Sequence, residues 1–183
     1  LVGDEAAMAY DRGVARLLRD DPGGARHDLQ AARAGTRDPL LRGQASRRLA
    51  ELAIERGELA RADAYLAEAR RDLAEDDVLT VYVDKLQAHV AQHREDPREV
   101  LAVYRSAMPR LHRPGRTRVR ISENEADLAL QGAWAMTRLH GRGEVVACPI
   151  ACDGCDALAC AGGLVGVAEQ ATPTAPEPRA RLH

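Results

Sequence analysis

The sequence predicts an all-α protein made of antiparallel helix pairs, followed by an irregular C-terminal tail. Two neighbouring stretches carry side chains at the spacing of one helix face, Leu49, Leu52, Ala53 and Arg56 in the first and Leu59, Ala62, Leu66 and Ala69 in the second. Gly57 stands between them, and glycine tolerates the left-handed backbone that closes a helix. The two stripes are therefore expected to face each other. Composition agrees, because alanine and leucine dominate the apolar residues and phenylalanine is absent, which favours closely packed helices over sheets.

The residues before this central pair predict two further helices. Asp4 is placed as the cap of a first helix that runs to about Arg19. The segment 20–24 contains two aspartates, a proline and two glycines, which predicts a turn. A second helix then runs to Ala34 and stops at Gly35.

Aspartate followed by proline marks the beginning of two later helices. Asp38 and Pro39 give a cap and a first-turn proline to the third helix, which leads into the central pair. The acidic residues 75–77 begin a fifth helix, expected over 78–94, because negative charge suits a helix N-terminus. The same aspartate–proline sequence at 96–97 begins a sixth helix, which should stop near Pro109.

One more helix is predicted before the pattern fails. Ser122 and Glu125 have the spacing of a capping box, and the helix that follows should end near Gly141. Its expected partner is interrupted by Pro149 and Gly154. We therefore predict a helical domain over 1–141, a partly ordered cysteine-containing segment over 142–166 and a proline-rich disordered tail over 167–183.

The central pair resembles the tetratricopeptide repeat (TPR) family in five positions. These are the small residue of the first helix, the glycine of the turn and the small-large-small positions of the second helix: Ala50, Gly57, Ala62, Leu66 and Ala69. The small and large positions recur at Ala25, Leu29 and Ala32 and again at Val100, Tyr104 and Ala107, in steps of 37 and 38 residues, within the range of helical arrays. The resemblance implies a TPR-like α-solenoid of about three and a half helix pairs.

The resemblance also implies a binding face on the first helix of each pair. Carried over by register, the candidate partner-binding residues are Tyr10, Gln44, Arg47, Glu51, Tyr82, Lys85, His89 and Gln92. Polar, aromatic and cationic groups in this arrangement suit an extended peptide or a segment of a partner protein. The alternative interpretation is an ordinary solvated face, since charges of both signs alternate on the other helices as well.

Four cysteines within thirteen residues form the most specific local pattern: Cys148, Cys152, Cys155 and Cys160. Thiolates this close can share zinc or an iron–sulfur cluster, which makes a small metal-binding protein the alternative function. Such a protein would lose its metal in a Cys152→Ser, Cys155→Ser double variant. The other interpretation is that these cysteines are reduced thiols in packing positions or in an irregular tail. Under this interpretation the chain needs no cofactor.

Several classes of function are disfavoured by the sequence. It contains no G-x-S-x-G, no phosphate loop and no G-x-G-x-x-G after a strand, so we expect no enzyme. Net charge is −2, and the basic loop 110–120 lacks interleaved aromatic residues, which argues against nucleic acid. No stretch resembles a membrane span or a signal peptide, so a cytoplasmic location is expected.

Positive charge comes almost entirely from arginine, with Lys85 the single lysine. In this respect the chain is similar to helical-repeat regions of actinobacterial regulators. The resemblance implies a peptide-binding scaffold, which would be the sensing or assembly part of a transcriptional regulator, with self-association possible.

Overall fold

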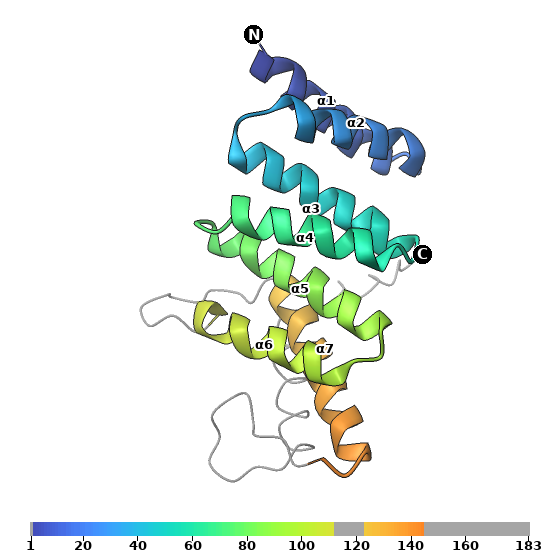
Figure 1. Ribbon diagram of the computed structural model, residues 1–183, viewed down its shortest axis with the longest axis vertical. Coiled ribbons are helices and arrows are strands. Elements are labelled where there is room, and N and C mark those ends of the chain that lie inside the picture. Colours follow the sequence, from blue (N-terminus) through green and yellow to red (C-terminus); the bar gives the residue numbers. More distant parts are fainter. Residues whose placement is uncertain (1, 112–122, 145–183) are drawn as a thin grey trace, which may run out of the picture.

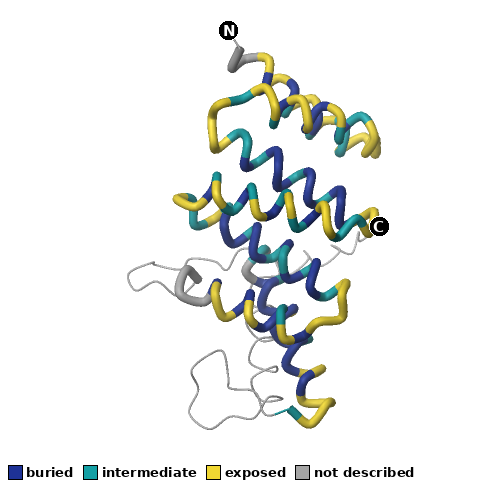
Figure 2. The backbone as a smooth tube through the Cα atoms, viewed as in Figure 1, coloured by how far each residue is buried: buried dark blue, intermediate teal, exposed yellow. Residues whose placement is uncertain are grey.

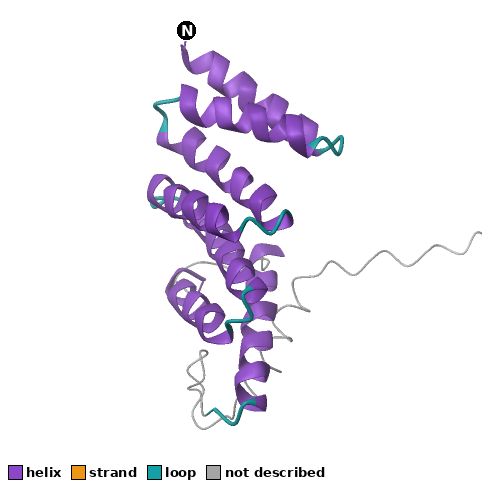
Figure 3. Cartoon of the chain, turned by 45° about the vertical axis from the view of Figure 1, so that its right-hand side comes forward, coloured by secondary structure: helices purple, strands orange, loops and turns teal. Residues whose placement is uncertain are grey.

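The computed structural model describes residues 2–111 and 123–144, and within these ranges the chain forms α-helices and no strands (Figures 1 and 3). In chain order the described helices are α1 (Val2–Leu17), α2 (Pro22–Gly35), α3 (Pro39–Glu55), α4 (Leu59–Asp72), α5 (Asp77–His93), α6 (Pro97–Leu111) and α7 (Glu123–Gly141). The expected all-α class is confirmed for these residues. None of the helices in the described ranges combines the length and apolar character needed to cross a membrane.

Each helix packs on the next one, and the helices follow one another down the long axis of the molecule (Figure 1). Odd-numbered helices also approach one another, since α1 contacts α3, α3 contacts α5 and α5 contacts α7. Among the described residues, no Cα atoms of α2 and α4, or of α4 and α6, come within 8 Å of each other. The odd-numbered helices therefore form a continuous layer, and we call its side chains the odd-helix face.

Four helix ends share one kind of turn. A residue two or three positions past the last helical residue has a positive φ, and the next residue donates its N–H to the carbonyl five positions back over 2.8 to 3.1 Å. This is the Schellman arrangement, which satisfies carbonyls that the helix end leaves free. The residues with positive φ are Asp20, Gly57, Glu95 and Gly143. The sequence singled out Gly57 as a helix stop and placed Asp20 in a turn, whereas Glu95, which is not glycine, was not identified.

Aspartate side chains cap most of the helix beginnings. The carboxylates of Asp21, Asp38, Asp76 and Asp96 each accept at least one backbone N–H at 2.9 to 3.0 Å from the first turn of α2, α3, α5 and α6. Such caps are typically worth about 1 kcal/mol each. Glu58 precedes α4 and makes no cap bond with its side chain.

The core consists largely of alanines and leucines. Figure 2 shows the buried positions along the described helices in dark blue. The predicted small and large positions of α2, α4 and α6 are all 3% exposed or less. Two glycines mark the tightest approaches. A Cβ added at Gly13 would lie 2.8 Å from Leu29 Cγ, and one added at Gly43 would lie 2.6 Å from Leu73 Cγ. Glycine is therefore needed at both positions for the helices to pack.

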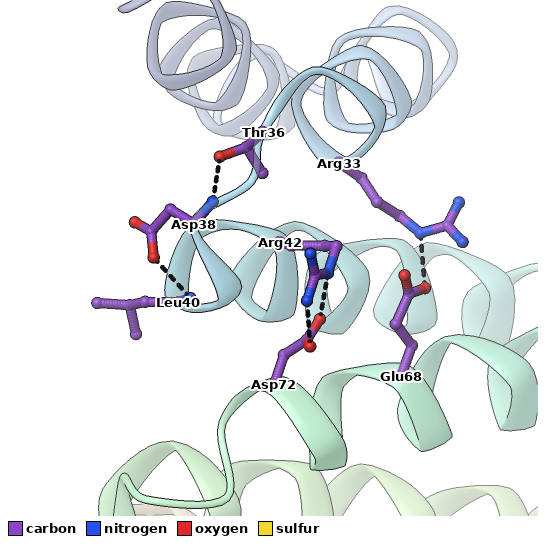
Figure 4. A network of polar contacts seen from close by, with 7 residues as sticks. All are labelled: Arg33, Thr36, Asp38, Leu40, Arg42, Glu68 and Asp72. Atoms are coloured by element: carbon purple, nitrogen blue, oxygen red, sulfur yellow. Dashed lines mark hydrogen bonds and ion pairs between the residues drawn. The ribbon is translucent and has the colours of Figure 1, made fainter. Parts of the chain in front are cut away.

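Ion pairs connect helices across the stack, as Figure 4 shows around α3. Arg42 of α3 donates two hydrogen bonds to Asp72 of α4, at 2.7 and 2.6 Å. Arg33 of α2 donates to Glu68 of α4 at 2.6 Å. These pairs bind α4 to both preceding helices, and bidentate geometry makes the Arg42 pair the more specific of the two.

Three predicted boundaries were wrong. α1 begins at Val2, so Asp4 lies inside the helix and not at the cap position before it. α2 begins at Pro22, inside the expected turn, because proline fits the first helical position. α6 continues to Leu111, past Pro109, which falls in the last turn and removes only one backbone donor there. Ser122 lies outside the described residues, so the predicted capping box stays a prediction.

Candidate partner-binding face

The predicted binding residues come from three successive odd-numbered helices. Tyr10 lies on α1; Gln44, Arg47 and Glu51 lie on α3; Tyr82, Lys85, His89 and Gln92 lie on α5. Because α1, α3, α5 and α7 contact one another directly, side chains separated by 30 to 40 positions become neighbours. Most of these residues belong to one network.

Tyr82 is the centre of this network. Its ring has the Arg47 guanidinium carbon 4.2 Å from the centroid and the Lys85 ammonium nitrogen 4.7 Å from it. Both distances are within the range of cation–π attraction. An aromatic ring of α5 thus holds one cation from α3 and one from its own helix.

Glu51 joins α3 to its neighbours. Its two carboxylate oxygens accept hydrogen bonds from Arg47 at 2.8 Å and from Arg48 at 2.9 Å. Burial first, and then the nearby Glu51 charge, raises the pKa of Tyr82 above its ordinary value. Burial lowers the pKa of Arg48 and Glu51 raises it more; Tyr10 of α1 adds to the raising, which continues the network to α1.

The network extends to α7 through Lys85, whose ammonium group donates to Asp127 at 3.1 Å. His89 lies one turn further along α5 and is half-buried. Burial, followed by the positive charge of Lys85, lowers the pKa of His89, although Asp127 acts in the opposite direction; His93 adds to the lowering. His89 therefore stays neutral to a lower pH than an unperturbed histidine, which is half protonated at pH 6.5.

Sequence reasoning missed two members of the network. Asp127 lies 42 positions from Lys85, and no local pattern connects the two. Arg48 follows Arg47 directly, which places it on a different face of an ideal helix, yet both arginines reach Glu51. Asp127 is recognised only from the tertiary structure, which brings its carboxylate next to Lys85.

Burial differs strongly among the predicted residues. Arg47 is only 5% exposed and its charge is used within the protein, by Glu51 and Tyr82. Gln44, His89 and Gln92 are half-buried, and Asp127 keeps 47% of its side chain exposed. A partner would therefore first meet the side chains of Gln44, Gln92 and His89 and the Lys85–Asp127 pair. Arg47, which is buried, would hold the Tyr82 ring in position.

The other candidate site cannot be located on this structure. Cys148, Cys152, Cys155 and Cys160 lie outside the described residues, as does the basic loop from 112 onward. Within the described ranges, no three side chains of histidine, cysteine, aspartate or glutamate are grouped so that they could hold a metal ion.

Comparison of the chain with protein-family models, curated proteins and solved structures finds no match to any of them. The class that the structure defines is an all-helical protein over the described residues, with a polar and aromatic network on its odd-helix face.

Proposed function

We propose that the chain is a non-catalytic, TPR-like helical scaffold that binds an extended peptide or a segment of a partner protein on the odd-helix face. We further propose that it serves as the sensing or assembly part of a larger regulator. The binding proposal depends most on one observation, the position of Tyr82 between Arg47 and Lys85, two cations that pair with the carboxylates of Glu51 and Asp127.

The repeat interpretation is supported by the recurring turns. The positive-φ residues Asp20, Gly57 and Glu95 are 37 and 38 positions apart, which are the steps separating the predicted small positions. At each of these turns the following residue stands at the cap position, directly before the second helix of a pair. A chain that repeats one turn and one packing position at the same interval is typical of a helical array.

A binding role is supported by the chemistry of the odd-helix face. An extended peptide offers backbone amides and carbonyls at every residue, and the amides of Gln44 and Gln92 can both donate and accept. The Lys85–Asp127 pair is partly exposed, so a peptide carboxylate can exchange with Asp127 at low cost. Tyr82 is held rigidly by its neighbours, which reduces the entropy lost on binding.

The test is a selection from a random peptide display library, followed by calorimetry on the selected peptides. A His89→Ala, Gln92→Ala double variant should weaken binding by about tenfold, as expected for the loss of two hydrogen-bonding side chains. Arg71→Ala is the control, because Arg71 is exposed on α4 and lies off the odd-helix face. Binding that the double variant leaves unchanged, or that both variants weaken equally, would contradict the proposal.

A further inference from the structure

A cavity of about 300 Å³ lies where α2, α3 and α4 meet, and it uses none of the residues of the network around Tyr82. This volume is at the lower end of the range for small-molecule sites. Its residues fall into an apolar floor, a polar rim and the ring of Tyr65. We call it the α2–α4 cavity; the floor is Leu49, Leu52 and Ala53, and the rim includes Arg26, Gln30, Arg56, Glu58 and Arg61.

The charge of the rim is unbalanced. Three arginines surround one carboxylate, which leaves two positive charges in excess although the chain as a whole carries −2. Glu58 accepts from Arg61 at 2.7 Å and has Arg26 at 3.7 Å. The hydrogen bond from Arg61 lowers the pKa of Glu58, and Arg26 and Arg56 add to this effect. Glu58 therefore neutralises only one of the three positive charges of the rim.

The beginning of α4 adds to this preference. Glu58 stands at the cap position, but its carboxylate is turned to the arginines and makes no cap bond. The positive end of the α4 dipole therefore borders the cavity without a capping side chain, unlike α2, α3, α5 and α6. The N-terminus of α4 therefore adds to the positive potential of the rim arginines.

We propose that the α2–α4 cavity binds a small organic anion, with its carboxylate or phosphate group held by the rim arginines and its apolar body against the partly exposed ring of Tyr65. Guanidinium groups bind both kinds of anion through paired N–H donors. Tyr65 supplies an aromatic wall, with the Arg33 guanidinium carbon 5.5 Å from its ring centroid. The site is independent of peptide binding on the odd-helix face.

A second cavity provides an internal comparison. It has a volume of about 280 Å³, shares Leu52 with the first, and is bordered by Asp20, Arg48, Glu51 and Glu55. Its rim therefore has an excess of negative charge. An anion that is recognised by charge should enter the first cavity and avoid the second.

The experiment is a titration followed by amide NMR, with benzoate, phenyl phosphate and the uncharged benzamide as probes. Benzoate or phenyl phosphate should shift the amides of residues 53–61 with dissociation constants of roughly 1–10 mM or tighter, as expected for fragments of this size. Benzamide should bind at least about tenfold more weakly, since it lacks the charge. The stronger of the two anions identifies the ligand class as carboxylate or phosphate.

Variants test whether the rim holds the anion. Arg26→Gln with Arg56→Gln should weaken binding by about tenfold, whereas Arg19→Gln with Arg37→Gln, which removes the same charge from exposed positions outside the cavity, should have little effect. Glu58→Gln should strengthen binding severalfold, because it removes the competing carboxylate. Gln30→Trp places a large side chain on the rim from an exposed position and should block entry.

Three results would overturn the proposal: equal binding of benzamide and benzoate, equal weakening by the two arginine double variants, or shifts that avoid residues 53–61. None of them bears on peptide binding, which is tested by calorimetry with the His89→Ala, Gln92→Ala double variant. The two proposals can therefore fail separately.

Discussion

Replacing Glu51 by glutamine tests how much the odd-helix face depends on one carboxylate. Glu51 accepts hydrogen bonds from Arg47 at 2.8 Å and from Arg48 at 2.9 Å, and the exposed side-chain fractions of the three residues are 17%, 7% and 30%. The glutamine keeps the shape but removes the charge. Arg47 would then be a buried cation without a counter-ion.

The magnitude follows from burial. Removing one partner of a fully buried ion pair typically costs about 3–5 kcal/mol, whereas an exposed pair is worth about 1 kcal/mol or less. Arg47 is close to the fully buried case, and Arg48 lies between the buried and the exposed case. The loss is reduced because the glutamine oxygen can still accept one hydrogen bond. We therefore expect Glu51→Gln to lower the free energy of unfolding by about 2 kcal/mol, or the melting temperature by about 4–8 °C.

The assay is thermal and urea unfolding followed by circular dichroism, with Glu55→Gln as the control. Glu55 lies one turn further along α3 and is exposed, so its replacement should change stability by less than about 0.5 kcal/mol. Replacing Arg47 and Glu51 together by methionine should lower the free energy of unfolding by about 1–3 kcal/mol less than the sum of the losses in the Arg47→Met and Glu51→Met single variants. Additive effects, or a Glu51→Gln variant as stable as the original, would refute the reasoning.

Three further changes test the packing, the turns and the pH response. Gly43→Ala should destabilise the fold by about 1–2 kcal/mol in urea unfolding, because overpacking outweighs the gain in helix propensity, whereas Gly141→Ala, with open space around it, should not. Glu95→Gly should stabilise the fold by about 1 kcal/mol and so raise the melting temperature, because glycine adopts the left-handed conformation of this residue without strain. A lower melting temperature would contradict this. His89 has a lowered pKa in the folded state, so the unfolded chain binds more protons and stability should fall as the pH drops through 6.5. His89→Gln should reduce this loss, measured by unfolding between pH 5 and 8, and the exposed control His140→Gln should reduce it less.

Helix positions could be predicted from the sequence because their signals are local. The apolar spacing around Leu66, the glycine at 57 and the aspartate–proline sequences each act within a few residues, so a linear sequence contains them fully. The predicted all-α class and the buried small positions of α2, α4 and α6 are confirmed on this basis. The boundary errors at Pro22 and Pro109 arose where proline was interpreted as a stop although it lies in the first or last turn of a helix.

The candidate site depends on distances that no local pattern contains. Helical register placed Arg47 and Lys85 on one face, but the sequence could not show that Arg47 is buried against Tyr82 or that Lys85 pairs with Asp127. Such pairing depends on which helices approach one another, and close approach is possible only where residues such as Gly43 leave space. The α2–α4 cavity has the same origin, since its arginines come from α2, from the end of α3 and from α4. Local chemistry thus specifies the helices of this chain, whereas their packing specifies which charges neutralise one another and which are left for a ligand.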